Sequence, residues 1–98
     1  MSLLVRYTLK SATDHDHQTT AMTTLVADLK SQSIPVHYSC FTTANPTKFL
    51  GVLEFDTEAD FKAFQASAAF ATYKATVGPT FANPPETEQI ASIATTRA

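Results

Sequence analysis

The tyrosines and phenylalanines are the residues of this sequence best suited to bind a small molecule. A buried tyrosine needs a partner for its hydroxyl, and an apolar cleft edged by such hydroxyls suits a small aromatic ligand. Asn83 adds an amide beside Phe81 in a proline-rich loop. The pocket candidates are Tyr7, Tyr38, Phe49, Phe64, Phe70, Tyr73, Phe81 and Asn83. A closed aromatic core is the alternative interpretation of the same residues.

The stretch Asp14-His15-Asp16-His17 has the composition of a metal site but not its spacing. On a helix, two residues separated by one other point about 200° apart, so His15 and His17 do not converge. Two histidines without a third ligand also make a poor zinc site. We interpret the stretch as a solvated helix start whose acids suit the helix dipole, and we expect no metal.

His37 and Ser39 are two apart on a predicted strand, so their side chains share a face about 7 Å apart. No aspartate is close in sequence to orient the imidazole, so a histidine in an interface is favoured over a catalytic pair. Cys40 should pack as a small hydrophobe. As the only cysteine it excludes an intrachain disulfide and fits a reducing compartment, so we expect the cytoplasm.

Length and charge restrict the class of protein. A chain of 98 residues makes one domain, residues 1–98. Only 16% of its residues are charged, against roughly 25% in typical soluble domains, as expected if part of the surface is an interface. The net charge is −2 and no run of basic residues is present, so nucleic acid is not an expected partner. The first residues meet Arg6 too early for a signal peptide or membrane span.

The first half of the chain predicts a strand, a helix and a second strand. Residues 3–10 alternate, with Leu3, Val5, Tyr7 and Leu9 on one face. Thr13 and Asp16 resemble a capping box, which predicts a helix that runs to about Gln32. Its apolar stripe is Met22, Leu25, Val26 and Leu29. Alternation returns over residues 34–43 and predicts the second strand.

The second half predicts a hairpin, a broken helix and a last strand. A turn at 44–47 joins the second strand to a third at 48–55, which is apolar on both sides and therefore central. A helix capped by Asp56 or Thr57 breaks near Ser67 and continues as a shorter helix. Gly78, in a left-handed conformation, and Pro79 should end it. A loop at 79–85 precedes a last strand at 86–96, whose facing is ambiguous.

This order favours an α+β fold of ferredoxin-like βαββαβ layout. Short connections and right-handed crossovers lead to one four-stranded antiparallel sheet with both helices on one face. The other face has apolar residues that a second copy of the chain would cover, so we expect a homodimer. The candidates for this dimer face are Leu4, Arg6, His37, Ser39, Phe41, Leu50, Val52 and Glu54.

Two stretches carry a family resemblance. Residues 44–55 form a turn and a strand that ends in Glu54 and Phe55 and leads into an acid-capped helix. Within residues 61–70, an aromatic, a serine and a second phenylalanine follow at three-residue multiples: Phe61, Ser67 and Phe70. These motifs resemble the dimeric α/β-barrel superfamily, which includes the antibiotic-biosynthesis monooxygenases. The resemblance implies a dimeric α/β barrel that holds its ligand between the sheet and the broken second helix.

Phe64 stands where this family commonly has histidine, and the chain has no tryptophan. Phenylalanine cannot ligate iron, so the resemblance implies cofactor-independent oxidation of an aromatic or quinone-like molecule rather than a haem reaction. Tyr38 and Tyr73 would orient the molecule, with electrostatic help from Arg6 or Asn83. A dimeric ligand carrier or stress-type protein without chemistry is the second interpretation. The missing histidine and tryptophan favour this second interpretation.

Overall fold

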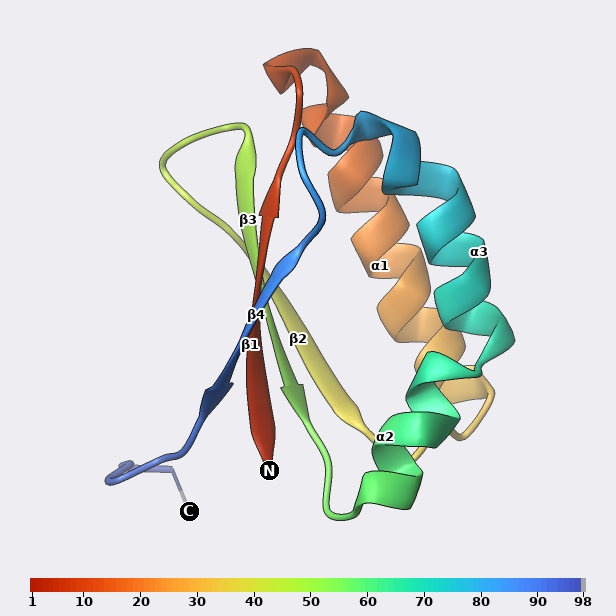
Figure 1. Cartoon of the computed structure of the whole chain (residues 1–98), viewed down its shortest axis with the longest axis vertical. Coiled ribbons are helices and arrows are strands. Elements are labelled where there is room, and N and C mark those ends of the chain that lie inside the picture. Colours follow the sequence, from red (N-terminus) through yellow and green to blue (C-terminus); the bar gives the residue numbers. More distant parts are fainter. Residues whose placement is uncertain (98) are drawn as a thin grey trace.

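A computed structural model describes residues 1–97 of the chain. Its elements are β1 (Ser2–Thr8), η1 (Ala12–Asp14), α1 (His15–Ser31), β2 (His37–Thr42), β3 (Lys48–Glu54), α2 (Glu58–Gln65), α3 (Ala68–Val77), η2 (Gly78–Thr80) and β4 (Glu86–Ile90). The four strands form one antiparallel sheet in the order β2-β3-β1-β4, and the helices lie on one side of it (Figure 1). The predicted ferredoxin-like fold is confirmed. Ala98, the end of the predicted domain, lies outside the described residues.

The strand register divides the sheet into an inner face toward the helices and an outer face. Leu4 lies opposite Val52, which in turn lies opposite Ser39, so these three side chains share the outer face. The same register places all the predicted dimer-face residues there: Leu4, Arg6, His37, Ser39, Phe41, Leu50, Val52 and Glu54. Their pairing with a second copy remains a prediction.

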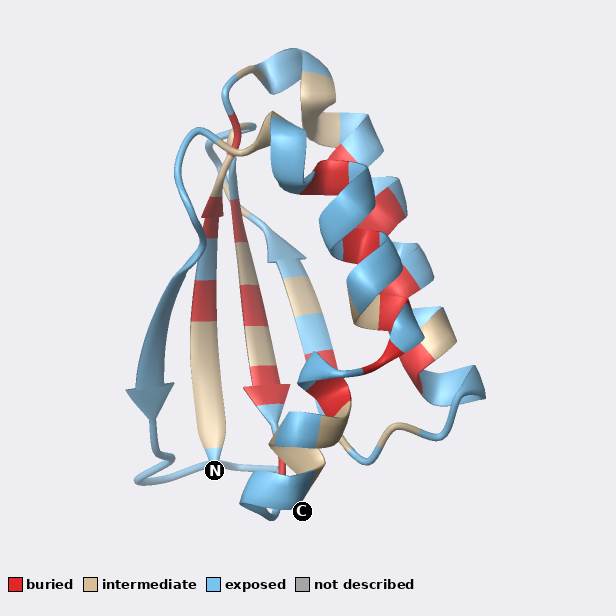
Figure 2. Ribbon diagram, turned by 45° about the vertical axis from the view of Figure 1, so that its right-hand side comes forward, coloured by how far each residue is buried: buried red, intermediate tan, exposed pale blue. Residues whose placement is uncertain are grey.

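The core lies between the inner face and the helices (Figure 2). The buried stripe of α1 consists of Gln18, Ala21, Met22, Leu25 and Leu29. The predicted stripe is wrong for Val26, whose side chain is 36% exposed. Val26 lies on the flank of α1, where it borders a shallow groove against β2 rather than the core. Ala21 and the polar Gln18 are buried in the core instead.

Hydroxyl side chains set the helix boundaries. The predicted capping box at Thr13 is wrong, because Ser11 accepts a hydrogen bond from the Thr13 backbone N–H at 3.2 Å and caps η1. Thr57 caps α2 by accepting from Asp60 N–H at 3.1 Å. Ser67 makes the predicted break: its hydroxyl donates to the Phe64 carbonyl at 2.7 Å and accepts from Phe70 N–H at 3.1 Å. The helix after the break is the longer one, 10 residues against 8.

Several predicted ends also need correction. Gly78 is not left-handed: with φ −48° it leads into η2, whereas Ser33 has the left-handed φ of 54° after α1. The last strand ends at Ile90 rather than at residue 96. Its register against β1 settles the facing, because Thr87 lies opposite Val5 and therefore points inward. β1 ends at Thr8, and Leu9 forms a single bridge to Phe81.

Candidate ligand pocket between the sheet and the broken helix

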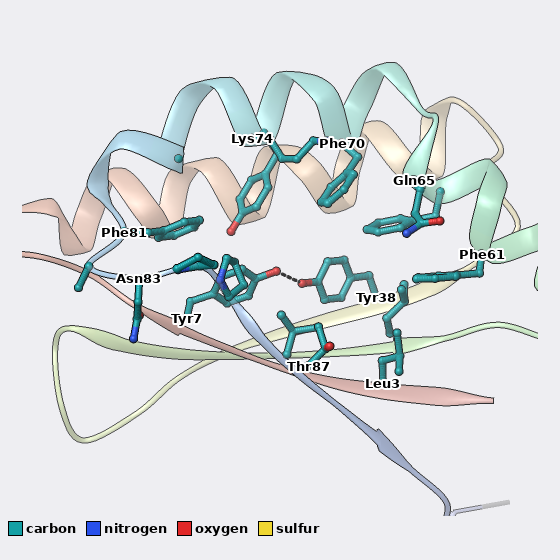
Figure 3. A pocket seen from close by; sticks show the side chains of 18 of the residues that line it. Leu3, Tyr7, Tyr38, Phe61, Gln65, Phe70, Lys74, Phe81, Asn83 and Thr87 are labelled. Atoms are coloured by element: carbon teal, nitrogen blue, oxygen red, sulfur yellow. Dashed lines mark hydrogen bonds between the residues drawn. The ribbon is translucent and has the colours of Figure 1, made fainter.

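A pocket of about 730 Å³ lies between the inner face of the sheet and the helices α2 and α3. Because Ser67 interrupts the helix, Phe64 before the break and Phe70 after it both line the pocket. The loop that follows η2 closes one end with Phe81 and Asn83, and Phe61 of α2 lies at the other end (Figure 3). The sheet, the broken helix and the loop therefore border a cavity, and the aromatic residues between them do not form a closed core.

The structure brings most of the pocket candidates together. The ones that line the cavity are Tyr7, Tyr38, Phe64, Phe70, Tyr73, Phe81 and Asn83. The prediction is wrong for Phe49, which is 1% exposed and packs against the His15 ring at a centroid distance of 4.9 Å. Phe49 shares the inner face with Leu53 but lies nearer the start of β3, under α1. Alternation along a strand predicts which face of the sheet a side chain lies on. It does not predict which helix residues pack against that side chain.

Three tyrosines line the pocket and form a connected group. The hydroxyls of Tyr7 and Tyr38 hydrogen-bond each other in the middle of the cavity (Figure 3). The Tyr73 hydroxyl accepts a hydrogen bond of 2.8 Å from Nε2 of Gln18, and its ring meets that of Tyr7 edge-on at 6.2 Å. Gly51 lies under Tyr38, where a Cβ atom would come within 2.5 Å of the hydroxyl oxygen. The three hydroxyls are therefore uncharged hydrogen-bonding groups in a largely apolar wall.

Burial should keep these tyrosines protonated in strong alkali. Burial raises the pKa of Tyr7, Tyr38 and Tyr73 above the usual value, and for Tyr7 the adjacent Tyr38 raises it further. Burial also raises the pKa of the Cys40 thiol to about 11. Each group therefore binds its proton more tightly when folded, and its stabilising contribution is lost as the pH rises above its unfolded pKa, about 10 for tyrosine.

We therefore predict that tyrosinate absorbance stays absent through about pH 11, where an exposed tyrosine is largely ionised. It should appear only together with the loss of circular dichroism, because unfolding must come first. The chain has no tyrosine outside this cluster. A titration with a midpoint near pH 10 and intact circular dichroism would contradict the buried arrangement.

Sequence reasoning missed Gln18 and two lysines. Gln18 is fully buried on α1 and contacts Tyr73, which is 55 residues away, so no local pattern indicates it. Lys10 and Lys74 line the pocket as exposed residues, and the Lys74 ammonium lies 4.8 Å from the centroid of the Phe70 ring. No aspartate or glutamate of residues 1–97 lines the cavity. The pocket is thus apolar inside and positively charged where it is exposed.

Other candidate residues lie away from the pocket. Arg6 is on the outer face and pairs with Glu88 at 3.3 Å, so the expectation that it helps bind the ligand is wrong. His37 and Ser39 are on that same outer face. The rings of His15 and His17 contact separate carbonyl oxygens, those of Pro46 and Thr76. Among residues 1–97 no three histidine, cysteine or acidic side chains are grouped as metal ligands.

Comparison with known proteins identifies the architecture. No known family model and no curated protein sequence matches the chain. Solved structures do match. A protein of Nitrosomonas europaea named as an antibiotic biosynthesis monooxygenase is 19% identical, with a TM-score of 0.82 over 94% of this chain and 88% of its own. A protein of the same name from Caulobacter crescentus is 14% identical, with a TM-score of 0.83 over 95% and 89% of the two chains.

The chain has the fold of the antibiotic biosynthesis monooxygenases. SnoaB, a cofactor-independent oxygenase from Streptomyces nogalater, shares it with 11% identity and a TM-score of 0.76 over 99% of this chain and 96% of that one. The resemblance seen in the sequence motifs is thus confirmed at the level of the fold. No helix within residues 1–97 has the length and hydrophobicity that crossing a membrane requires.

Proposed function

We propose that the pocket binds a small aromatic molecule and that the protein oxidises this molecule with O₂, without a cofactor. The observation that carries this proposal is the cavity of about 730 Å³ with tyrosine hydroxyls in its middle. A cavity of this size holds a ligand of two or three fused rings. The fold shared with SnoaB, described as a cofactor-independent oxygenase, supports the choice of reaction.

In this proposal the tyrosines and lysines hold the substrate, and the substrate supplies the electrons. Phenylalanine rings stack on the ligand, while Tyr38 and Tyr73 donate hydrogen bonds to its oxygen atoms. Lys10 and Lys74 favour a negatively charged ring system, such as a phenolate or enolate. A methylene carbon of such a ring loses two hydrogens and gains one oxygen atom from O₂. The other oxygen atom leaves as water, so the electrons balance.

A ligand carrier without chemistry is the second candidate. The observation that favours it is the absence of histidine and carboxylate from the lining formed by residues 1–97. General bases usually have a pKa near the working pH, and burial moves the pKa of all three tyrosines away from it. A carrier would need only the shape and the hydrogen bonds of the pocket.

Incubation of the protein with anthrone and ¹⁸O-labelled O₂ distinguishes the two functions. An oxygenase yields anthraquinone that carries one labelled oxygen atom, at a rate above that of buffer and of heat-denatured protein. A carrier binds anthrone, seen as quenching of tyrosine emission, without turnover above these controls. We expect Tyr38→Phe to slow the reaction by about 10- to 100-fold, because one hydrogen bond to the developing anion is lost. Failure of anthrone and smaller aromatics to bind at all would refute both functions.

We further propose that the protein works as a homodimer paired through the outer face, in a reducing cytoplasm. Half-buried apolar residues lie on this face between charged ones, with Leu4 opposite Val52 in the centre and Phe41, 50% exposed, near the β2 edge. A second copy related by a twofold axis would cover both chains' apolar residues at once. The unpaired thiol of Cys40 fits the reducing compartment.

A further inference from the structure

The tail, residues 91–97, follows β4 and has the composition of a strand without a neighbouring strand. Ile93 and two threonines of the tail are β-branched, which favours extended structure. β1 does not extend beside it, because the register places Ile90 opposite Ser2 and the chain then continues past the start of β1 (Figure 1). Ile93 is 100% exposed. Within residues 1–97 the tail thus carries an apolar side chain that packs against nothing.

The free edge of β2 is suited to receive such a segment. The strand order places β2 and β4 at the two edges of the sheet. β4 carries Glu86 and Glu88, and charged side chains on an edge strand discourage further pairing. β2 contains no lysine, arginine, aspartate, glutamate or proline. Its outer backbone groups are therefore available to a further strand.

A groove beside β2 fits Ile93. It has a volume of about 380 Å³, lies between α1 and β2, and has Met22, Cys40 and Phe49 in its lining. No residue of the tail lines it. Cys40 faces this groove from the inner face of the sheet, where it lies opposite Gly51. Every second side chain of a strand added to β2 would point to the same side as Cys40, so Ile93 could fill the groove.

An acidic pocket of about 340 Å³ lies at the start of β2. The side chains of its lining that can carry charge are those of Glu54, Asp56, Asp60 and His37. The Met1 amino group there already donates to the Phe55 carbonyl at 2.8 Å. Arg97 is the only charged residue of the tail. A guanidinium and a group of carboxylates are complementary in charge and in hydrogen bonding.

An antiparallel alignment satisfies both sites at once. With Ile93 opposite Cys40, residues 91–96 lie opposite residues 42–37 and cover the whole of β2. Arg97 then lies just beyond the start of β2, beside the carboxylates of the acidic pocket. The tail of the same chain cannot adopt this alignment. It starts at the other edge of the sheet, about 14 Å away, and crossing that distance would use about four of its residues.

We propose that the tail of each chain pairs with β2 of a second copy, with Ile93 in the groove and Arg97 at the acidic pocket. This inference rests on the proposed homodimer and adds a second contact to it. A twofold axis makes the exchange of tails reciprocal. Tyr38 lines both the groove and the ligand pocket, so Ile93 of the partner subunit packs behind the wall of that pocket.

Ile93→Cys tests the contact, because the one natural cysteine, Cys40, lies in the groove. Facing residues on antiparallel strands have Cα atoms about 4.5–5.5 Å apart, within the range of a disulfide. We expect oxidised glutathione to join the new thiol to Cys40 of the partner subunit. Most of the protein should then run as a covalent dimer on a non-reducing gel, and mass spectrometry of its peptides identifies the joined residues.

Ser92→Cys is the matched control, since its side chain would point to the opposite side of the added strand. It should form at least about 10-fold less of the disulfide to Cys40. Ile93→Cys combined with Cys40→Ser should lose the band that joins the tail to β2. The inference is wrong if Ile93→Cys forms no disulfide with Cys40, or if Ser92→Cys forms it equally well.

Ile93→Asp measures what the tail contributes to pairing, and its exposed position leaves the fold of each chain unchanged. We expect the dissociation constant of the dimer to rise at least about 10-fold, because each of two grooves loses a buried isoleucine. The outer face should still hold the two chains together at micromolar concentration. An unchanged dissociation constant would refute the inference and leave the homodimer standing. A monomeric unmodified protein would refute both, and the proposed ligand oxidation would be unaffected.

Discussion

Gly51→Ala is expected to lower the free energy of unfolding by about 1–3 kcal/mol and to weaken ligand binding. The new Cβ would lie 2.5 Å from both the Cε1 and the hydroxyl oxygen of Tyr38, and 2.9 Å from its Cζ. The ring cannot tilt freely, because Phe64 packs against it at a centroid distance of 5.8 Å and its hydroxyl is bonded to Tyr7. Tyr38 must therefore leave its place in the cavity. Urea unfolding and titration with anthrone measure the two effects.

The chain offers its own control, since it has only one other glycine. A Cβ on Gly78 would meet no atom within 4 Å, and the residue has an ordinary helical backbone. Gly78→Ala should therefore be neutral or stabilise the protein by up to about 1 kcal/mol. The effect of Gly51→Ala should also shrink in a Tyr38→Leu background, because leucine ends before the atoms that clash. Equal effects of Gly51→Ala in both backgrounds would show that Tyr38 is not the obstacle.

Val52→Arg is expected to separate the proposed homodimer into monomers. Val52 lies on the outer face between Leu4 and Ser39, and a twofold axis would bring the new charge into the interface twice. An unpaired charge in an interface weakens association by several kcal/mol, so we expect a dissociation constant raised at least about 100-fold. Sedimentation velocity at micromolar concentration measures the change.

Val26→Arg controls for the added charge. Val26 is also a partly exposed valine, but it lies on α1, on the opposite side of the sheet from the outer face. This variant should remain a dimer. A monomeric unmodified protein would contradict the pairing, and a dimeric Val52→Arg variant would place the interface on another surface.

The order of elements could be predicted from the sequence because the apolar period changes clearly between strands and helices. Val5 and Tyr7 alternate with Leu4 and Arg6, and the structure places the two sets on opposite faces. The break at Ser67 was also predictable, because the stripe of Phe61 and Phe64 does not continue into Tyr73. Local patterns of this kind lie within one element and need no knowledge of its neighbours.

The rest depends on contacts between distant segments. Val26 and Ala21 both fit a helical stripe, and only the packing of α1 on the sheet exposes one and buries the other. In the sequence Gln18 is an ordinary polar residue near a helix start, and only the folded structure shows its contact with Tyr73. Gly51 reads as a weak point in a strand, although it makes room for a ring on the neighbouring strand β2. Gln18 and Gly51 shape the candidate site, and neither carries a local signal.

All three tyrosines of the chain line one cavity, and the chain has no tryptophan. This arrangement has a practical consequence. The near-ultraviolet emission of the folded protein comes almost entirely from the walls of the candidate site. A bound aromatic ligand that absorbs in that range will quench the tyrosine emission by energy transfer. The protein therefore needs no label for a fluorescence screen of compound collections, and every decrease in its emission reports on a single place in the molecule.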